Sequence, residues 1–200
     1  MRKLFITLCV AGVALSACLS NPAPLRYGDE EYAVYSAIIR EKYLHRGVQQ
    51  IVINEQTERY QRDPSRESVW DEITVIKEAF AIWSIRADTV ADYIAQNKAQ
   101  HRLENRFTLP VPVSLLSSKE NEEIFSQPGL QEMWQRFYQR YPKSPGLLTL
   151  SRVGFNYTRN QALVYVACSC GSLCGVGEYY FLVKTDGVWK FEMARQLWVS

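Results

Sequence analysis

Hydrophobic side chains recur with helical spacing in four segments between residues 29 and 141. The predicted helices span residues 29–45, 69–83, 88–99 and 130–141. Asp88 is placed to cap the third helix, while Gly47 and Pro142 follow the ends of the first and the last. The 69–83 segment also alternates in part, so its pattern leaves a strand open, and a polar loop is expected before it over residues 55–67.

The pattern changes after Gly146, where apolar and polar residues alternate to the end of the chain. Alternation predicts strands over residues 147–155, 161–168, 178–184, 188–194 and 196–200. Asp186-Gly187 is a dipeptide typical of tight hairpin turns. We expect Trp189, Phe191 and Met193 to face the core. Shorter extended segments are predicted earlier, over residues 48–54 and 107–116.

Helices followed by a sheet indicate an α+β fold, in which N-terminal helices pack on one face of a C-terminal antiparallel β-meander. A curved sheet covered in this way is similar to the cystatin-like and nuclear-transport-factor-like architectures, an analogy of shape alone. The length after residue 27 suits one domain, which we place at residues 28–200.

The N-terminus has the parts of a secretory signal. It reads Arg2, Lys3, an apolar run from Leu4 to Ala14, and then Leu15-Ser16-Ala17-Cys18. The last four residues resemble the lipobox of bacterial lipoproteins. The resemblance implies cleavage after residue 17 and a diacylglyceryl thioether on Cys18, which would anchor the protein in a lipid bilayer.

Two alternatives to lipidation are an ordinary signal peptide cut after Ser16 and an uncleaved membrane anchor. Leu4 to Ala17 is shorter than the roughly 20 residues that a spanning helix needs. Residues 18–27 form a tether with two prolines. Leu19 after the lipidated cysteine is similar to the outer-membrane class of lipoproteins, which implies an outer-membrane anchor facing the periplasm.

The charge balance changes once the signal is removed. The full chain has 23 basic and 21 acidic residues, and Arg2 and Lys3 belong to the signal. The mature chain therefore has no net positive charge, and nucleic acid is not an expected partner.

The C-terminal half has several short motifs in a characteristic order. They are Trp134-x-x-Phe137-Tyr138, Ser151-Arg152-Val153-Gly154-Phe155-Asn156, Ala162-Leu163-Val164-Tyr165, Cys170-Gly171-Ser172-Leu173-Cys174-Gly175 and Trp198. Together they resemble an uncharacterised family of secreted bacterial proteins. The resemblance implies a shared fold and brings no activity with it.

Three cysteines remain in the mature domain besides Cys18, in an oxidising compartment. We expect a disulfide between Cys170 and Cys174, with Cys168 free and buried; a bond between Cys168 and Cys174 is the alternative. A metal site built on the three thiols would need His45 or His101 as a fourth ligand, and the spacing is unlike a zinc ribbon. No metal or cofactor is expected.

The sequence contains no recognised catalytic motif, and no catalytic residue is assigned. Glu178 and Glu192 could pair as acid and base only if neighbouring strands bring them together. Gly171, Gly175 and Gly177 are expected to shape the turn of a hairpin. Arg152 lies where alternation predicts an apolar position, so either a bulge turns it outward or it is a buried cation that faces a ligand.

These observations favour a non-enzymatic binding or accessory module of the cell envelope, whose partner is an envelope protein or a small ligand. The alternative is an envelope enzyme with a pocket between the curved sheet and the helices. A thiol or metal module built on the cysteine loop, residues 168–174, is a third hypothesis.

Overall fold

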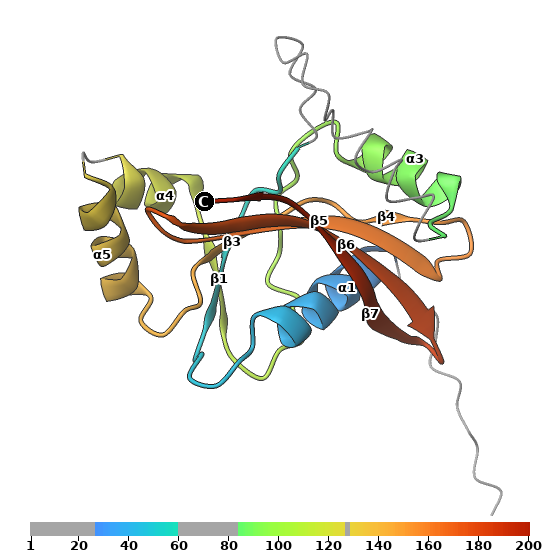
Figure 1. The fold of residues 1–200 in the computed structure, drawn as a ribbon, viewed down its shortest axis with the longest axis horizontal. Coiled ribbons are helices and arrows are strands. Elements are labelled where there is room, and N and C mark those ends of the chain that lie inside the picture. The colour runs from blue at the N-terminus through green and yellow to red at the C-terminus, as the bar shows by residue number, and fades with distance from the viewer. Residues whose placement is uncertain (1–26, 60–83, 127–128) are drawn as a thin grey trace, which may run out of the picture.

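The computed structural model describes residues 27–59, 84–126 and 129–200 (Figure 1). In chain order the elements are α1 (Tyr27–Lys42), β1 (Ile51–Asn54), α3 (Ala87–Gln96), β2 (Val113–Leu116), α4 (Ser118–Phe125), α5 (Leu130–Arg140), β3 (Leu147–Leu150), β4 (Gly154–Phe155), β5 (Gln161–Gly171), β6 (Cys174–Thr185) and β7 (Val188–Val199). The α+β class is confirmed. Most of the predicted 55–67 loop and the predicted 69–83 helix lie outside the described residues.

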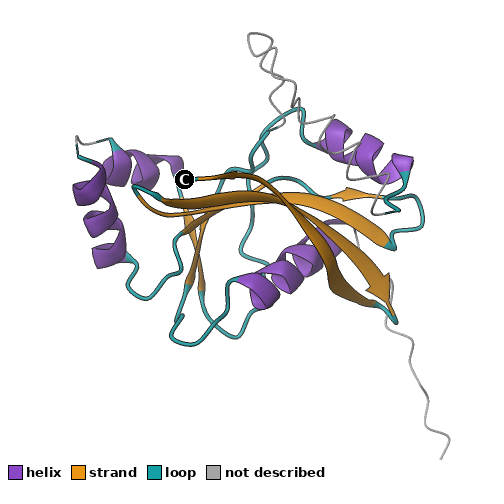
Figure 2. Ribbon diagram, viewed as in Figure 1, coloured by secondary structure: helices purple, strands orange, loops and turns teal. Residues whose placement is uncertain are grey.

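The strands form one seven-stranded sheet in the order β2-β1-β3-β5-β6-β7, with β4 paired to β5. The C-terminal strands β5, β6 and β7 are antiparallel neighbours, which confirms the predicted meander (Figure 2). The two early strands extend this sheet. β1 lies between β2 and β3 and is parallel to both, so the sheet is mixed.

Helices cover both faces of the sheet, and the prediction of one covered face is wrong. On one face α1 buries Tyr35 and Ile38 against β5 residues such as Val164. On the other face Tyr93 of α3 packs beside Leu163, the neighbour of Val164 along the same strand. Neighbouring residues of a strand point to opposite faces. β5 is buried at nearly every position from Ala162 to Cys168, so its two faces both require a covering layer.

The second layer on the α3 side continues over the other end of the sheet. Phe137 of α5 and Ile124 of α4 pack with Val52 and Leu147, which face away from α1. α4 was not predicted. It begins with a capping box in which the Ser117 side chain accepts a hydrogen bond from the Glu120 N–H, while the Glu120 carboxylate accepts one from the Ser117 N–H.

The predicted strand over residues 147–155 is broken in the middle. β3 ends at Leu150 and β4 begins at Gly154. Ser151 still exchanges hydrogen bonds with Tyr165, through its N–H to the Tyr165 carbonyl and from the Tyr165 N–H to its hydroxyl, both at 2.9 Å. The break therefore falls at Arg152 and Val153.

A register shift in β7 changes which side chains face the core. The register with β6 shifts between Phe181 and Leu182, which pair with Met193 and Phe191. Trp189 is buried on the α1 side as predicted. The shift turns Met193 to the opposite face beside Phe181, where it is 37% exposed, so its predicted core position is wrong. β7 also continues without a break to Val199.

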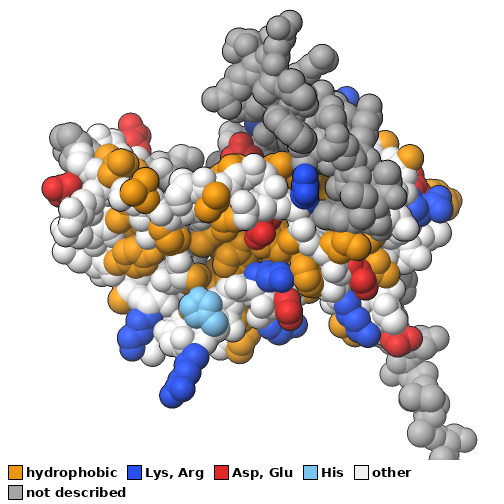
Figure 3. Space-filling model, in the orientation of Figure 1, with side chains coloured by type: hydrophobic (Ala, Val, Ile, Leu, Met, Phe, Trp, Pro, Cys, Tyr) orange, Lys and Arg blue, Asp and Glu red, His pale blue; other side chains and the backbone are white. Residues whose placement is uncertain are grey.

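None of the described helices is both long enough and apolar enough to cross a bilayer. On the face drawn in Figure 3, basic and acidic side chains are spread over the surface without a large patch of one sign.

Candidate functional site

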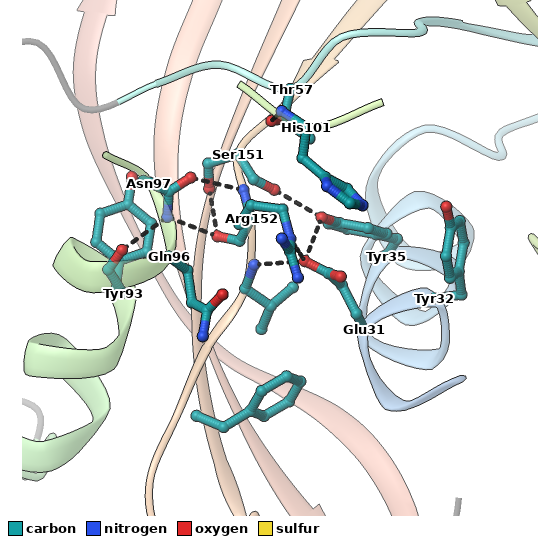
Figure 4. Close-up of polar contacts among 12 residues, drawn as sticks. Glu31, Tyr32, Tyr35, Thr57, Tyr93, Gln96, Asn97, His101, Ser151 and Arg152 are labelled. Carbon is teal, nitrogen blue, oxygen red and sulfur yellow. Dashed lines mark hydrogen bonds and ion pairs between the residues drawn. The ribbon is translucent and has the colours of Figure 1, made fainter. Parts of the chain in front are cut away.

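Arg152, the residue that sequence alternation marked as unusual, takes part in a buried ion pair. Its Nε donates to Glu31 Oε1 of α1 at 2.7 Å (Figure 4). The exposed fractions are 14% for the Arg152 side chain and 4% for the Glu31 side chain. Arg152 is therefore a largely buried cation, as one of the two alternatives stated, but the group that it faces is a carboxylate of the same chain.

The same Glu31 oxygen accepts two further hydrogen bonds. The Tyr35 hydroxyl lies 3.0 Å away and the Val153 N–H also 3.0 Å away. The Tyr35 hydroxyl is also 2.7 Å from the Ser151 carbonyl oxygen. Burial, and then the charge of Glu31, raise the pKa of Tyr35 well above its ordinary value, so the hydroxyl stays protonated and remains a donor.

Asn97 completes this network from the side of α3. The Arg152 N–H donates to Asn97 Oδ1 at 2.7 Å, and Asn97 Nδ2 donates to the carbonyl oxygens of Arg152 and Tyr93 at 3.0 and 2.8 Å. Asn97 is fully buried at the end of α3. The network thus joins α1, the break between β3 and β4, and α3 (Figure 4). Its role is structural, because it holds these three elements together.

The strongest candidate for a binding site is a cavity of about 530 Å³ between α4 and the C-terminal ends of β1 and β3. Its amide and hydroxyl lining comes chiefly from Asn54, Gln56, Thr57, Gln100, Asn121 and Thr149. Glu58 and Glu122 add two carboxylates, and Leu116 and Phe125 add apolar surface. No Lys, Arg or His belongs to the described lining.

Hydrogen bonds fix the floor of this cavity. Asn54 Nδ2 donates to Thr149 Oγ1 at 2.7 Å, and Asn121 Nδ2 donates to Asn54 Oδ1 at 3.0 Å. This chain links the ends of two parallel strands to α4, so the three side chains have defined orientations before any ligand arrives. Phe125 is held by an edge contact with Trp134, with ring centroids 5.3 Å apart.

Sequence reasoning did not identify Asn54, Asn121 or Thr149. The available signals were the polar end of a buried strand at Asn54 and the capping box that begins α4. Those signals locate an element end, but the three residues meet only because β1 pairs in parallel with β3. That pairing is a property of the whole sheet.

The two glutamates considered as an acid and base pair are not brought together. Glu178 pairs across the sheet with Gln196 and accepts a hydrogen bond from the Tyr180 hydroxyl. Glu192 lies in the register shift of β7. Within the described ranges no group of three or more His, Cys, Asp or Glu residues has metal-binding geometry. Neither His45 nor His101 lines the cavity.

The cysteine loop has the pairing that the sequence favoured. Cys170 and Cys174 form a disulfide with Cα atoms 5.1 Å apart, and Cys168 is free and buried. Burial raises the pKa of the Cys168 thiol to about 11. The nearby Gly177 makes room for Trp198, since a Cβ there would lie 2.1 Å from the indole nitrogen.

Comparison of the chain with protein-family models, with curated proteins and with solved structures finds no match. The function is therefore inferred from the residues and geometry described above.

Proposed function

We propose that the chain is a lipoprotein of the bacterial cell envelope, held to a membrane by acylated Cys18, whose domain is a non-enzymatic binding module. We infer the membrane anchor from the order of residues at the N-terminus, where Leu15-Ser16-Ala17-Cys18 directly follows a basic start and an apolar run. Two or more acyl chains hold a protein stably on a bilayer.

The cavity between α4 and the ends of β1 and β3, which we call the α4 cavity, supports the binding role and indicates the class of ligand. Its volume of about 530 Å³ is within the range of small-molecule sites. Amides such as Asn54 and Asn121 offer both donors and acceptors, and the described part of the lining, with two carboxylates and no cation, disfavours a phosphate or carboxylate. A neutral, hydroxyl- and amide-rich ligand fits this chemistry, and a short glycan of the envelope is such a ligand.

Binding is proposed instead of catalysis because the described lining holds no hydrogen-bonded pair of nucleophile and base. The two carboxylates of the lining come from different segments, Glu122 from α4 and Glu58 from the chain after β1. Hydrogen-bonded amides on the floor favour a fixed set of ligand contacts.

The anchor is tested by Cys18→Ala. We expect this variant to leave the membrane fraction or to accumulate with residues 1–17 uncleaved, and we expect mass spectrometry of the wild-type N-terminus to show an acylated Cys18. An unmodified wild-type N-terminus at Ala17, or retention of residues 1–17 in the wild type, would contradict the proposal.

The ligand class is tested by calorimetric titration of the mature protein with a β-1,4-linked N-acetylglucosamine tetramer. Thr149→Val removes one hydroxyl from the cavity floor at nearly constant volume, and we expect the affinity to fall about tenfold. Glu123→Gln is the control, since Glu123 belongs to α4 but does not line the cavity. Equal affinity of both variants and the wild type, or no binding to the wild type, would count against a glycan site.

A further inference from the structure

We propose that one end of the domain, formed by residues 156–160 and 185–188, lies directly against the lipid bilayer. We call this surface the hairpin end. The inference rests on the acylation of Cys18 proposed above and goes beyond it, because an anchor alone does not specify which surface of the domain meets the lipid.

The two loops of the hairpin end are neighbours in space. The Lys184 N–H donates to the Asn160 carbonyl oxygen at 2.9 Å. Gln161 and Val183, which follow and precede the two loops, are paired across the sheet. The turn between β4 and β5 and the turn between β6 and β7 therefore lie at the same end of the strands (Figure 1).

The described chain begins beside this surface. Glu30, in the first turn of α1, accepts a hydrogen bond from the Trp189 indole N–H at 2.8 Å and forms an ion pair with Lys184. Both partners flank the β6–β7 turn. Figure 1 shows α4 and α5 at the opposite end of the long axis of the molecule. The first turn of α1, where the described chain begins, thus lies near the hairpin end.

The length of the tether limits the orientation of the domain. Eight residues separate Cys18 from Tyr27, and at an extended rise of about 3.1 Å per residue they reach about 25 Å. A domain of this size has a diameter of about 40 Å. The tether is therefore too short for α4 and α5 to rest on the bilayer while Tyr27 stays at the far end.

The hairpin end also has side chains suited to a lipid surface. Tyr157 is 94% exposed and Val188 is 59% exposed. An exposed tyrosine ring makes little contribution to the packing of its own domain, whereas tyrosine is favoured at the boundary between lipid and water. Insertion of Tyr157 and Val188 among lipid headgroups would bury apolar surface that the fold leaves in water.

Carboxylates at this end are largely neutralised by neighbouring groups. Asp88 accepts hydrogen bonds from the Tyr157 N–H and from Arg86 Nε, each at 3.0 Å. These contacts, the Tyr157 N–H foremost, lower the pKa of Asp88. Glu30 is paired with Lys184. Lys190 adds an exposed cation and Asp186 an exposed carboxylate, so an anionic lipid surface meets no excess of negative charge.

A depth-sensitive fluorescence experiment tests this contact. The full acylated protein, with Cys168→Ala to remove the free thiol, receives one new cysteine by Tyr157→Cys, Val188→Cys or Leu130→Cys. Each is labelled with a nitrobenzoxadiazole probe without reductant and placed in phosphatidylethanolamine and phosphatidylglycerol vesicles. Leu130 is the matched control, because it is an exposed apolar residue, 60% exposed, at the start of α5.

Headgroup-spin-labelled lipids should quench the probes at positions 157 and 188 at least twofold more strongly than the probe at 130. Flotation and mass spectrometry check that each variant is acylated and bound to vesicles. Equal quenching at all three positions, or stronger quenching at 130, in acylated and vesicle-bound protein would overturn the contact and leave the anchor intact. Absence of acylation would overturn the anchor and the contact together.

A label-free measurement guards against effects of the probe. Hydrogen exchange of the wild type should be slower for residues 156–160 and 185–188 on vesicles than in detergent solution. Residues 118–126, at the opposite end, should exchange equally in both. Unchanged exchange in the two loops of vesicle-bound protein would contradict the proposal.

Discussion

Replacement of Glu31 by glutamine is the sharpest test of the network around Arg152. Glu31 Oε1 receives Arg152, Tyr35 and the Val153 N–H within 3.0 Å, and its side chain is 4% exposed. Glu31→Gln keeps the shape and one accepting oxygen but removes the charge. Arg152 is then a buried cation without its carboxylate.

The expected magnitude follows from this geometry. Loss of one partner of a buried ion pair destabilises a protein by about 3–5 kcal/mol. Arg152 keeps 14% of its side chain in water, and an amide oxygen still accepts hydrogen bonds, so we expect a loss in the free energy of unfolding of about 3 kcal/mol. In a domain of this length the thermal midpoint should fall by about 6–12 °C.

Urea unfolding of the detergent-solubilised mature protein, followed by tryptophan fluorescence, measures the loss. Lys119→Gln is the control, since its ion pair with Glu123 is solvent-exposed and contributes less than about 0.5 kcal/mol. The double variant Glu31→Gln with Arg152→Met removes both charges and should be more stable than the sum of the two single losses predicts. A loss for Glu31→Gln no larger than that for Lys119→Gln, or single losses that add in the double variant, would show that the Glu31–Arg152 pair does not stabilise the fold.

Two further predictions concern close packing and the free thiol. Gly154→Ala places a Cβ 2.4 Å from the Tyr93 backbone and should lower the free energy of unfolding by about 3 kcal/mol. Gly171→Ala is the control, and its loss should be smaller. Equal losses in urea unfolding would show that α3 can move away from Gly154. Burial raises the pKa of Cys168 to about 11. This thiol should therefore react with iodoacetamide at pH 8 roughly 100-fold more slowly in native than in unfolded protein. Fast labelling of the native protein, or a disulfide at Cys168 in peptide mapping, would contradict the structure.

The C-terminal meander was predictable because its contacts are local. β5 and β6 contain continuous apolar runs rich in β-branched and aromatic residues, and β7 alternates in polarity from Trp189 to Met193. Asp186-Gly187 marks the β6–β7 turn where the chain reverses. The position of Met193 was not predictable, because a register shift in β7 moves it to the other face and simple alternation contains no sign of the shift.

The partners of the polar side chains could not be read from the sequence. Alternation identified Arg152 as unusual, but its carboxylate lies 121 residues earlier on α1. The cavity has the same origin, since Asn54 meets Thr149 across 95 residues and Asn121 across 67. Periodicity indicates which face a residue occupies, and the identity of the opposing residue depends on how the strands are ordered.

The placement of β1 between β2 and β3 has a consequence for the order of folding. β5, β6 and β7 pair with immediate neighbours along the chain, so their meander closes short loops and can form early. β1 must wait, because Val52 pairs with Leu147 and its other neighbour, β2, is also distant in sequence. A chain exported from its N-terminus, as we propose for this protein, therefore exposes the apolar residues of β1 until the C-terminal third has arrived. This segment is where we expect a nascent chain to depend on a chaperone.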